Sequence, residues 1–134
     1  MAGYAKELGE AEDRLKVKGK NLEDANKEQA AWRYFYDVRK AELGALVEYF
    51  ETQKNKIRSR LFKGMENYPR DLSDRAKDKY IDHEQDYLTI VETYLEVKEM
   101  YDKYSALVGA FEARGFALRN ITEIRIHSLE NTEI

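Results

Sequence analysis

The chain has 134 residues, a net charge of −3 and 37% charged residues. It contains no cysteine, which excludes disulfides and thiolate metal sites and suits a reducing, cytoplasmic setting. Seven glycines and one proline are few for a turn-rich sheet, and the apolar runs are far shorter than the roughly 20 residues of a membrane-spanning helix. We therefore predict an all-α chain that forms a single domain over residues 1–134 and does not enter a membrane.

The first predicted element, over residues 1–20, is a short helix followed by a basic linker. Its apolar residues recur at spacings of four, three and four, which places them on one face of a helix. They are Tyr4, Leu8, Ala11 and Leu15. Gly19 is expected to end this element.

A long helix is predicted over residues 21–64. Asn21 suits the N-cap position. Glu23 and Asp24 place negative charge in the first turn, where it complements the helix dipole. The helix is expected to end in a basic motif.

Residues 65–73 are predicted to break the helical pattern. They hold the only proline, Pro69, and Asp71 or Ser73 can cap a following helix. That helix is predicted over residues 74–114, where apolar residues recur at alternating spacings of four and three, the pattern of helices that pack lengthwise against each other. These residues are Ile90, Tyr94, Val97, Tyr101, Tyr104, Val108 and Phe111.

Gly115 is expected to end the long helix, because glycine suits the residue that follows a helix C-terminus. Residues 115–134 then form a short C-terminal helix and tail, with Asn120 as its cap. The alternation of Ile124 and Ile126 also permits a strand. We favour the helix.

The lengths of the two long helices predict self-association. A helix of about 40 residues is roughly 60 Å long, whereas a compact chain of this size is about 36 Å across. One chain is too small to cover such long helices, and other copies of the same chain are the simplest partners. We therefore predict a homo-oligomeric helical ring or open barrel. The predicted contact residues are Tyr94, Tyr101, Tyr104, Val108 and Phe111. A self-sufficient antiparallel hairpin is the monomeric alternative.

A basic segment, KNKIRSRLFK, stands out in this acidic chain. Its cations are Lys54, Lys56, Arg58, Arg60 and Lys63. On a helix they flank the apolar stripe of Ile57 and Leu61 in two rows, which suits a nucleic-acid backbone. Aromatic side chains that can stack on unpaired bases are Tyr34, Tyr36, Phe62 and Tyr68. A solvated helix face is the simpler interpretation.

Other charged patterns carry less information. An acidic row recurs every four residues, at Asp74, Asp78, Asp82 and Asp86. It is interpreted either as a solubilising helix face or as a docking strip for a basic surface of a partner. His83 is the only histidine near such acids, and one cluster does not make a di-metal bundle. We expect no enzymatic activity, no catalytic residues, no cofactor and no metal site.

Two stretches resemble a known family. FETQKNKIRSRLFKG at residues 50–64 and ARGFALRNITEIR at residues 113–125 are similar to the UvsY family of recombination mediators from T-even-type bacteriophages. The similarity runs from about Ala30 to Arg125, with Trp32 near its start. Residues 1–29 and the tail from His127 match the family pattern poorly.

The resemblance implies a non-enzymatic factor that binds single-stranded DNA as a homo-oligomeric ring, with a hexamer or heptamer expected. The implied partners are a RecA-like recombinase, UvsX, and the single-strand-binding protein that covers the DNA. The implied roles are recombination, repair and replication in the cytoplasm of an infected bacterium.

Family positions carry over to individual residues. Arg58 and Arg60 fill the DNA-binding motif, and Lys54, Lys56 and Lys63 join them on the charge argument alone. The segment that ends in Phe116 carries over as a region of self-association. The alternative function is a structural coiled-coil adaptor whose basic band pairs with acids of a neighbouring subunit.

Overall fold

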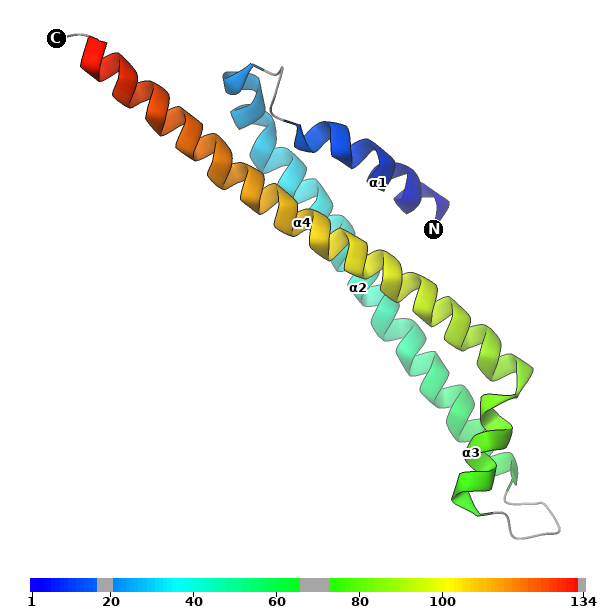
Figure 1. Cartoon of the computed structure of the whole chain (residues 1–134). Helices are drawn as coiled ribbons and strands as arrows, with labels where there is room; N and C mark the ends of the chain where they lie inside the picture. Colours follow the sequence, from blue (N-terminus) through cyan, green and yellow to red (C-terminus); the bar gives the residue numbers. More distant parts are fainter. Residues whose placement is uncertain (17–20, 66–72, 133–134) are drawn as a thin grey trace. The chain divides into compact units, whose positions relative to one another are not determined.

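The structure is a computed structural model that describes residues 1–16, 21–65 and 73–132, with side chains described up to residue 129. It contains the helices α1 (Ala2–Leu15), α2 (Leu22–Gly64), α3 (Asp74–Asp82) and α4 (Gln85–Thr132) (Figure 1). No strand is found in these ranges, so the predicted all-α fold is confirmed. Within the same ranges, no helix is long and apolar enough to cross a membrane. Assembly into a ring stays a prediction.

The predicted N-terminal signals are found where helices begin. Asn21 Oδ1 accepts a hydrogen bond from the backbone N–H of Glu23 at 2.8 Å, which caps the start of α2. Ser73 caps α3 in the same way, because its hydroxyl accepts from the backbone N–H of Ala76 at 3.2 Å. Gly19, Pro69 and Asp71 lie outside the described residues.

The predicted continuous helix over residues 74–114 is wrong at its N-terminal end. The helix is interrupted after Asp82, and α4 begins at Gln85. His83 Nδ1 donates to the carbonyl of Lys79 at 2.8 Å, and the N–H of Glu84 donates to the carbonyl of Ile81 at 3.0 Å. These bonds use carbonyls at the end of α3 that a continuing helix needs for its own ladder.

The predicted end at Gly115 is also wrong, because α4 runs through this residue to Thr132. A separate C-terminal helix over residues 115–134 therefore does not exist, although residues 120–129 are helical as favoured. Gly115 has another role, since an added Cβ would lie 2.9 Å from Gln29 Nε2. The glycine gives this side chain of α2 room against the backbone of α4.

The chain divides into two compact units. Unit 1 comprises Met1–Ala41 and Asp102–Ile134, and unit 2 comprises Glu42–Tyr101. The prediction of a single domain stays a prediction.

An aromatic core fills unit 1. Tyr36, Tyr104 and Phe111 are fully buried. The ring of Tyr36 stacks on Phe111 with centroids 5.1 Å apart and lies 6.2 Å from the ring of Tyr104. Ala11 of α1 and Leu118 of α4 are also buried, and hydrogen bonds join α1 to both long helices.

Unit 2 is built around Leu43, Ile81 and Val97, which are buried. Gly44 on α2 allows close approach of Tyr101 on α4, because an added Cβ would lie 3.3 Å from the ring atom Cε2. Ile81 joins α3 to this core, which places α3 beside the C-terminal part of α2.

Candidate nucleic-acid interface

The outer face of α2 in unit 2 carries the exposed part of the basic segment. Lys56, Arg60 and Lys63 lie three or four residues apart, so the helix places them in one row. Together they line a shallow hollow of about 560 Å³ with three neutral polar residues, Thr52, Asn55 and Ser59. All six side chains are exposed. We call this surface the cation row.

Arg58 points away from the cation row and is engaged by α3. Its Nη2 donates to Asp78 Oδ1 at 2.9 Å, and its Nη1 donates to Asp82 Oδ1 at 3.2 Å. The guanidinium also lies over the ring of Tyr87, 5.2 Å from the centroid. The side chain is 34% exposed.

The acids of α3 hold Arg58 in its charged form. Burial lowers the pKa of Arg58, but the hydrogen bonds to Asp78 and Asp82 outweigh this effect and raise the pKa above its ordinary value. Arg58 is therefore a partly exposed cation with partners in unit 2, and two members of the predicted acidic strip are paired with it within the chain.

Lys54 is placed on the same side as Arg58. Its Nζ lies 4.5 Å from the centroid of the Tyr94 ring, a cation–π contact. The five predicted DNA-binding cations are thus divided between a cation row and two side chains with partners in unit 2. Arg60 Nη2 lies 4.0 Å from Asp86 Oδ2. Both side chains are largely exposed, so this ion pair contributes little to fixing the position of Arg60.

The residues predicted for self-association are mostly inside the chain. Tyr104 and Phe111 are fully buried, and Val108 is 7% exposed. Tyr94 and Tyr101 are half-buried in the contacts with Lys54 and Gly44 described above. Phe116 differs, since it is 61% exposed.

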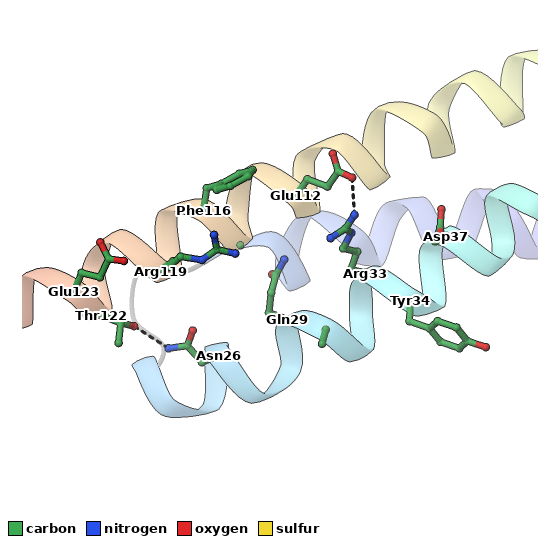
Figure 2. Close-up of a pocket in the computed structure, with 12 residues that line it drawn as sticks. Asn26, Gln29, Arg33, Tyr34, Asp37, Glu112, Phe116, Arg119, Thr122 and Glu123 are labelled. Atoms are coloured by element: carbon green, nitrogen blue, oxygen red, sulfur yellow. Dashed lines mark hydrogen bonds and ion pairs between the residues drawn. The ribbon is translucent and has the colours of Figure 1, made fainter. Parts of the chain in front are cut away.

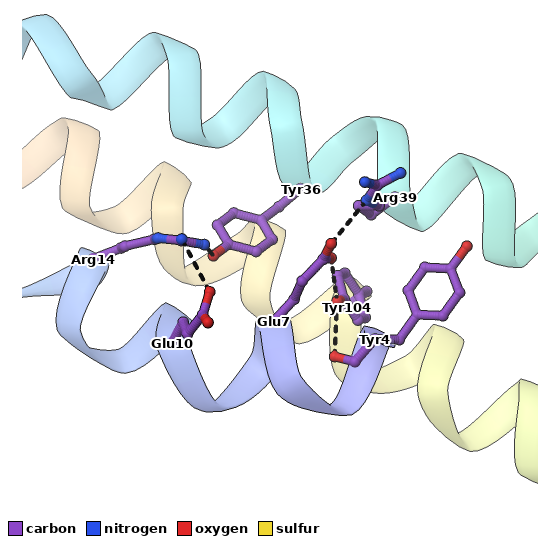
Figure 3. A network of polar contacts seen from close by, with 7 residues as sticks. All are labelled: Tyr4, Glu7, Glu10, Arg14, Tyr36, Arg39 and Tyr104. Atoms are coloured by element: carbon purple, nitrogen blue, oxygen red, sulfur yellow. Dashed lines mark hydrogen bonds and ion pairs between the residues drawn. The ribbon is translucent and has the colours of Figure 1, made fainter. Parts of the chain in front are cut away.

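Helix α1 contacts Tyr104, one of the residues that the sequence assigned to an interface with a neighbouring subunit. The hydroxyl of Tyr104 donates to the carbonyl of Tyr4 at 3.0 Å and lies 2.9 Å from Glu7 Oε2 (Figure 3). Burial, and then the bond to Glu7, raise the pKa of Tyr104. Arg39 Nε donates to the other carboxylate oxygen of Glu7 at 3.2 Å.

A second polar contact fixes the other end of α1. Arg14 Nη1 donates to the hydroxyl of Tyr36 at 2.6 Å (Figure 3), and its guanidinium lies 4.0 Å from the centroid of Trp32. The bond to Tyr36 raises the pKa of Arg14. The sequence did not predict these contacts, because nothing in a helical period identifies which polar residues will pair across helices.

A groove in unit 1 lies between α2 and α4 and has a volume of about 810 Å³. Two polar contacts join the helices across this groove (Figure 2). Arg33 Nη2 forms an ion pair with Glu112 Oε1 at 2.7 Å, and Asn26 Nδ2 donates to Thr122 Oγ1 at 3.2 Å. Tyr34, 74% exposed, and Phe116 lie at its borders. Acids and bases both line this groove, so its charge does not favour a polyanion.

The other predicted stacking aromatics are less accessible. Tyr36 is buried in the core of unit 1. Lys77 Nζ lies over the ring of Phe62, 4.8 Å from its centroid. Tyr68 lies outside the described residues. In the ranges 1–16, 21–65 and 73–129, no group of three or more side chains of the metal-ligating types is found.

Comparisons with known proteins identify the fold. No protein-family model and no curated protein matches the sequence. A solved structure does match, that of the recombination mediator protein UvsY of bacteriophage T4. The two structures agree with a TM-score of 0.79 over 93% of this chain and 98% of the other, at 13% sequence identity. The resemblance predicted from the sequence is thus confirmed at the level of the fold.

Proposed function

We propose that this chain is a non-enzymatic recombination mediator that binds single-stranded DNA. In this role it helps a RecA-like recombinase to load onto DNA covered by single-strand-binding protein, in phage recombination, repair and recombination-dependent replication. The observation that carries the proposal is the fold similarity over nearly the whole chain to a protein described as a recombination mediator. A homo-oligomer in the cytoplasm of an infected bacterium, without a cofactor, belongs to the same proposal.

The DNA contact is assigned to the cation row. Lys56, Arg60 and Lys63 are exposed and follow each other about one helical turn, or roughly 5 Å, apart. Arg supplies planar paired donors for phosphate oxygens, and the hydroxyl and amide groups beside it in the hollow are further phosphate donors. Arg58 is left out of the proposed contact set, because its two terminal nitrogens each donate to an aspartate of α3.

One cation row is a weak binding surface, because cations from the salt compete with its three side chains for the DNA phosphates. A homo-oligomer repeats the row once per subunit. The binding of one subunit then raises the local concentration of the strand at the next subunit. Assembly therefore supports the proposed affinity without requiring new contacts.

The test is a salt series of oligo-dT titrations on the parent and on Lys56→Ala/Arg60→Ala. Each phosphate contact on a single strand contributes roughly −0.7 to the slope of log affinity against log salt. Loss of two contacts should therefore flatten the slope by about 1.4 per engaged subunit and weaken binding most at low salt. The matched control is Lys98→Ala/Arg125→Ala, which removes the same charge from exposed positions of α4.

The stability of Arg58→Ala distinguishes a cation that stabilises the fold from the cations that are proposed to bind DNA. Each of its two ion pairs is partly exposed, and such pairs contribute about 0.2–1 kcal/mol. Arg58→Ala should lower the free energy of unfolding by about 1 kcal/mol, whereas Lys56→Ala should leave it nearly unchanged. Urea denaturation followed by circular dichroism measures both.

A structural adaptor is the second candidate function. The ion pairs of Arg58 lie within the chain, so they support a packing role for part of the basic segment in place of the predicted pairing with a neighbouring subunit. In an adaptor, the basic segment would serve packing alone. Unchanged affinity and slope in Lys56→Ala/Arg60→Ala, with salt altering only the size measured by light scattering, would replace the DNA proposal with this one.

A further inference from the structure

Helix α3 presents different side chains on two of its faces. Asp78 and Asp82 face α2, where Arg58 binds both carboxylates. On the opposite side, Ala76, Lys79, Tyr80 and His83 line a hollow of about 400 Å³. Residues at these spacings share one helical face, so the hollow belongs to α3 alone.

The surface of this hollow carries one exposed aromatic ring and one lysine. Tyr80 is 60% exposed, and Lys79 and His83 are exposed on either side of it. The bond from His83 Nδ1 to the carbonyl of Lys79 holds the imidazole in place at the end of α3. A large exposed aromatic ring beside a lysine is the arrangement with which proteins bind unpaired bases and their phosphates.

Arg58 holds the two aspartates on the face of α3 that lies toward α2. The aspartates of α3 lie about one turn apart on the inner face, and the guanidinium between them offsets one of their two negative charges. Ile81, which is fully buried, anchors the same inner face to the core of unit 2. The ion pairs and this anchor together direct Tyr80 and Lys79 outward.

We propose that the hollow on α3 is a second DNA contact, in which one unpaired base stacks on Tyr80 and Lys79 binds a neighbouring phosphate. This inference rests on the proposed function and adds a base contact to the phosphate contacts of the cation row. It predicts tighter binding to single-stranded DNA than to duplex DNA, because only an unpaired base can leave its stack and reach the ring of Tyr80.

The two residues have different signatures in the same titration. Alanine substitution of a stacking residue weakens single-strand binding by about 1–3 kcal/mol per base, which corresponds to roughly fivefold or more. Tyr80→Ala should show this loss with an unchanged salt slope, and Tyr80→Phe should retain parent affinity. Lys79→Ala should flatten the slope by about 0.7 per engaged subunit.

Photocrosslinking locates the contact independently of affinity. An oligo-dT that carries 5-iodouracil should crosslink to the peptide that contains Tyr80, and the crosslink should be lost in Tyr80→Ala. The matched control is Tyr49→Ala, since Tyr49 is 56% exposed on α2 in the same unit. This variant should bind oligo-dT as the parent does, and circular dichroism confirms that each variant is folded.

The outcomes distinguish the two proposals. If Lys56→Ala/Arg60→Ala loses affinity while Tyr80→Ala binds and crosslinks as the parent does, the contact on α3 is wrong and the proposed function stands. If the parent itself does not bind oligo-dT, both are wrong. A folded Tyr80→Ala that loses both affinity and crosslink supports the contact on α3.

Discussion

Gln29 is one of the residues that join α2 to α4 in unit 1. Its Nε2 donates to the carbonyl of Phe111, and its Oε1 accepts from Arg114 Nη1 at 2.7 Å. Arg114 is 5% exposed, and its Nε and Nη2 have no hydrogen-bond partner. Burial lowers the pKa of Arg114, so its single bond to Gln29 compensates only part of the cost of burying the charge.

Gly115→Ala tests this arrangement. Alanine favours a helix by about 1 kcal/mol over glycine, but the new methyl group would displace Gln29 and break its bond to the charged Arg114, which costs roughly 1.5–3 kcal/mol. We expect a net loss of about 1 kcal/mol in the free energy of unfolding, measured by urea denaturation.

Gly109→Ala is the control for that substitution, because nothing lies within 4 Å of its added Cβ on the same helix. It should stabilise the chain by about 1 kcal/mol. Equal stabilisation by both substitutions would mean that Gln29 moves aside without loss.

At the scale of the element, α1 is held to the long helices by the polar network of Figure 3. The bonds of Tyr104 to Tyr4 and Glu7 are its best-defined part. The phenol is buried, and its pKa is raised above the ordinary value of about 10. The contribution of the neutral phenol to stability is therefore complete below about pH 10 and is lost as the pH rises through the folded value.

Tyr104→Phe should lower the free energy of unfolding by about 1 kcal/mol at neutral pH, the contribution of a typical hydrogen bond. Its stability should also fall less steeply than that of the parent above about pH 10. Tyr34→Phe, at a ring that is 74% exposed, should change neither quantity. Urea denaturation over a pH series measures both, and parallel profiles of Tyr104→Phe and the parent would contradict the assignment.

At the scale of the whole molecule, the structure changes where an oligomeric interface is to be sought. The heptad residues Tyr104 and Phe111 are enclosed by their own chain. The apolar side chains exposed on α4 in unit 1 include Phe116 and Ile124. Arg119 lies over the ring of Phe116 at 5.2 Å, which leaves much of that ring accessible.

Phe116→Glu should reduce the size of the predicted oligomer while the helical content remains. Phe111→Glu should instead unfold unit 1, because an unpaired charge in the core costs several kcal/mol. Leu95→Glu, at another exposed apolar position of α4, is the control and should assemble as the parent does. Sedimentation and circular dichroism separate these results, and an unchanged oligomer in Phe116→Glu would exclude Phe116 from the interface.

The sequence by itself determined the helical class, the start of α2 at Asn21 and the cap at Ser73. It also determined the likeness to a recombination mediator fold. These features are local, since they depend on composition, on spacing along one helix and on side chains that bond to their own backbone. The cation row belongs with them, because one helix is enough to align Lys56, Arg60 and Lys63.

Only the tertiary structure decided which predicted site residues have partners within the chain. A helical period shows that Tyr104 and Phe111 share a face, but either a neighbouring subunit or other helices of the same chain can cover such a face. Likewise, the charge of Arg58 is visible in the sequence, whereas its two aspartates come from a helix on the far side of a break. Pairing across helices depends on the geometry of packing, and the sequence pattern of a single helix does not contain that geometry.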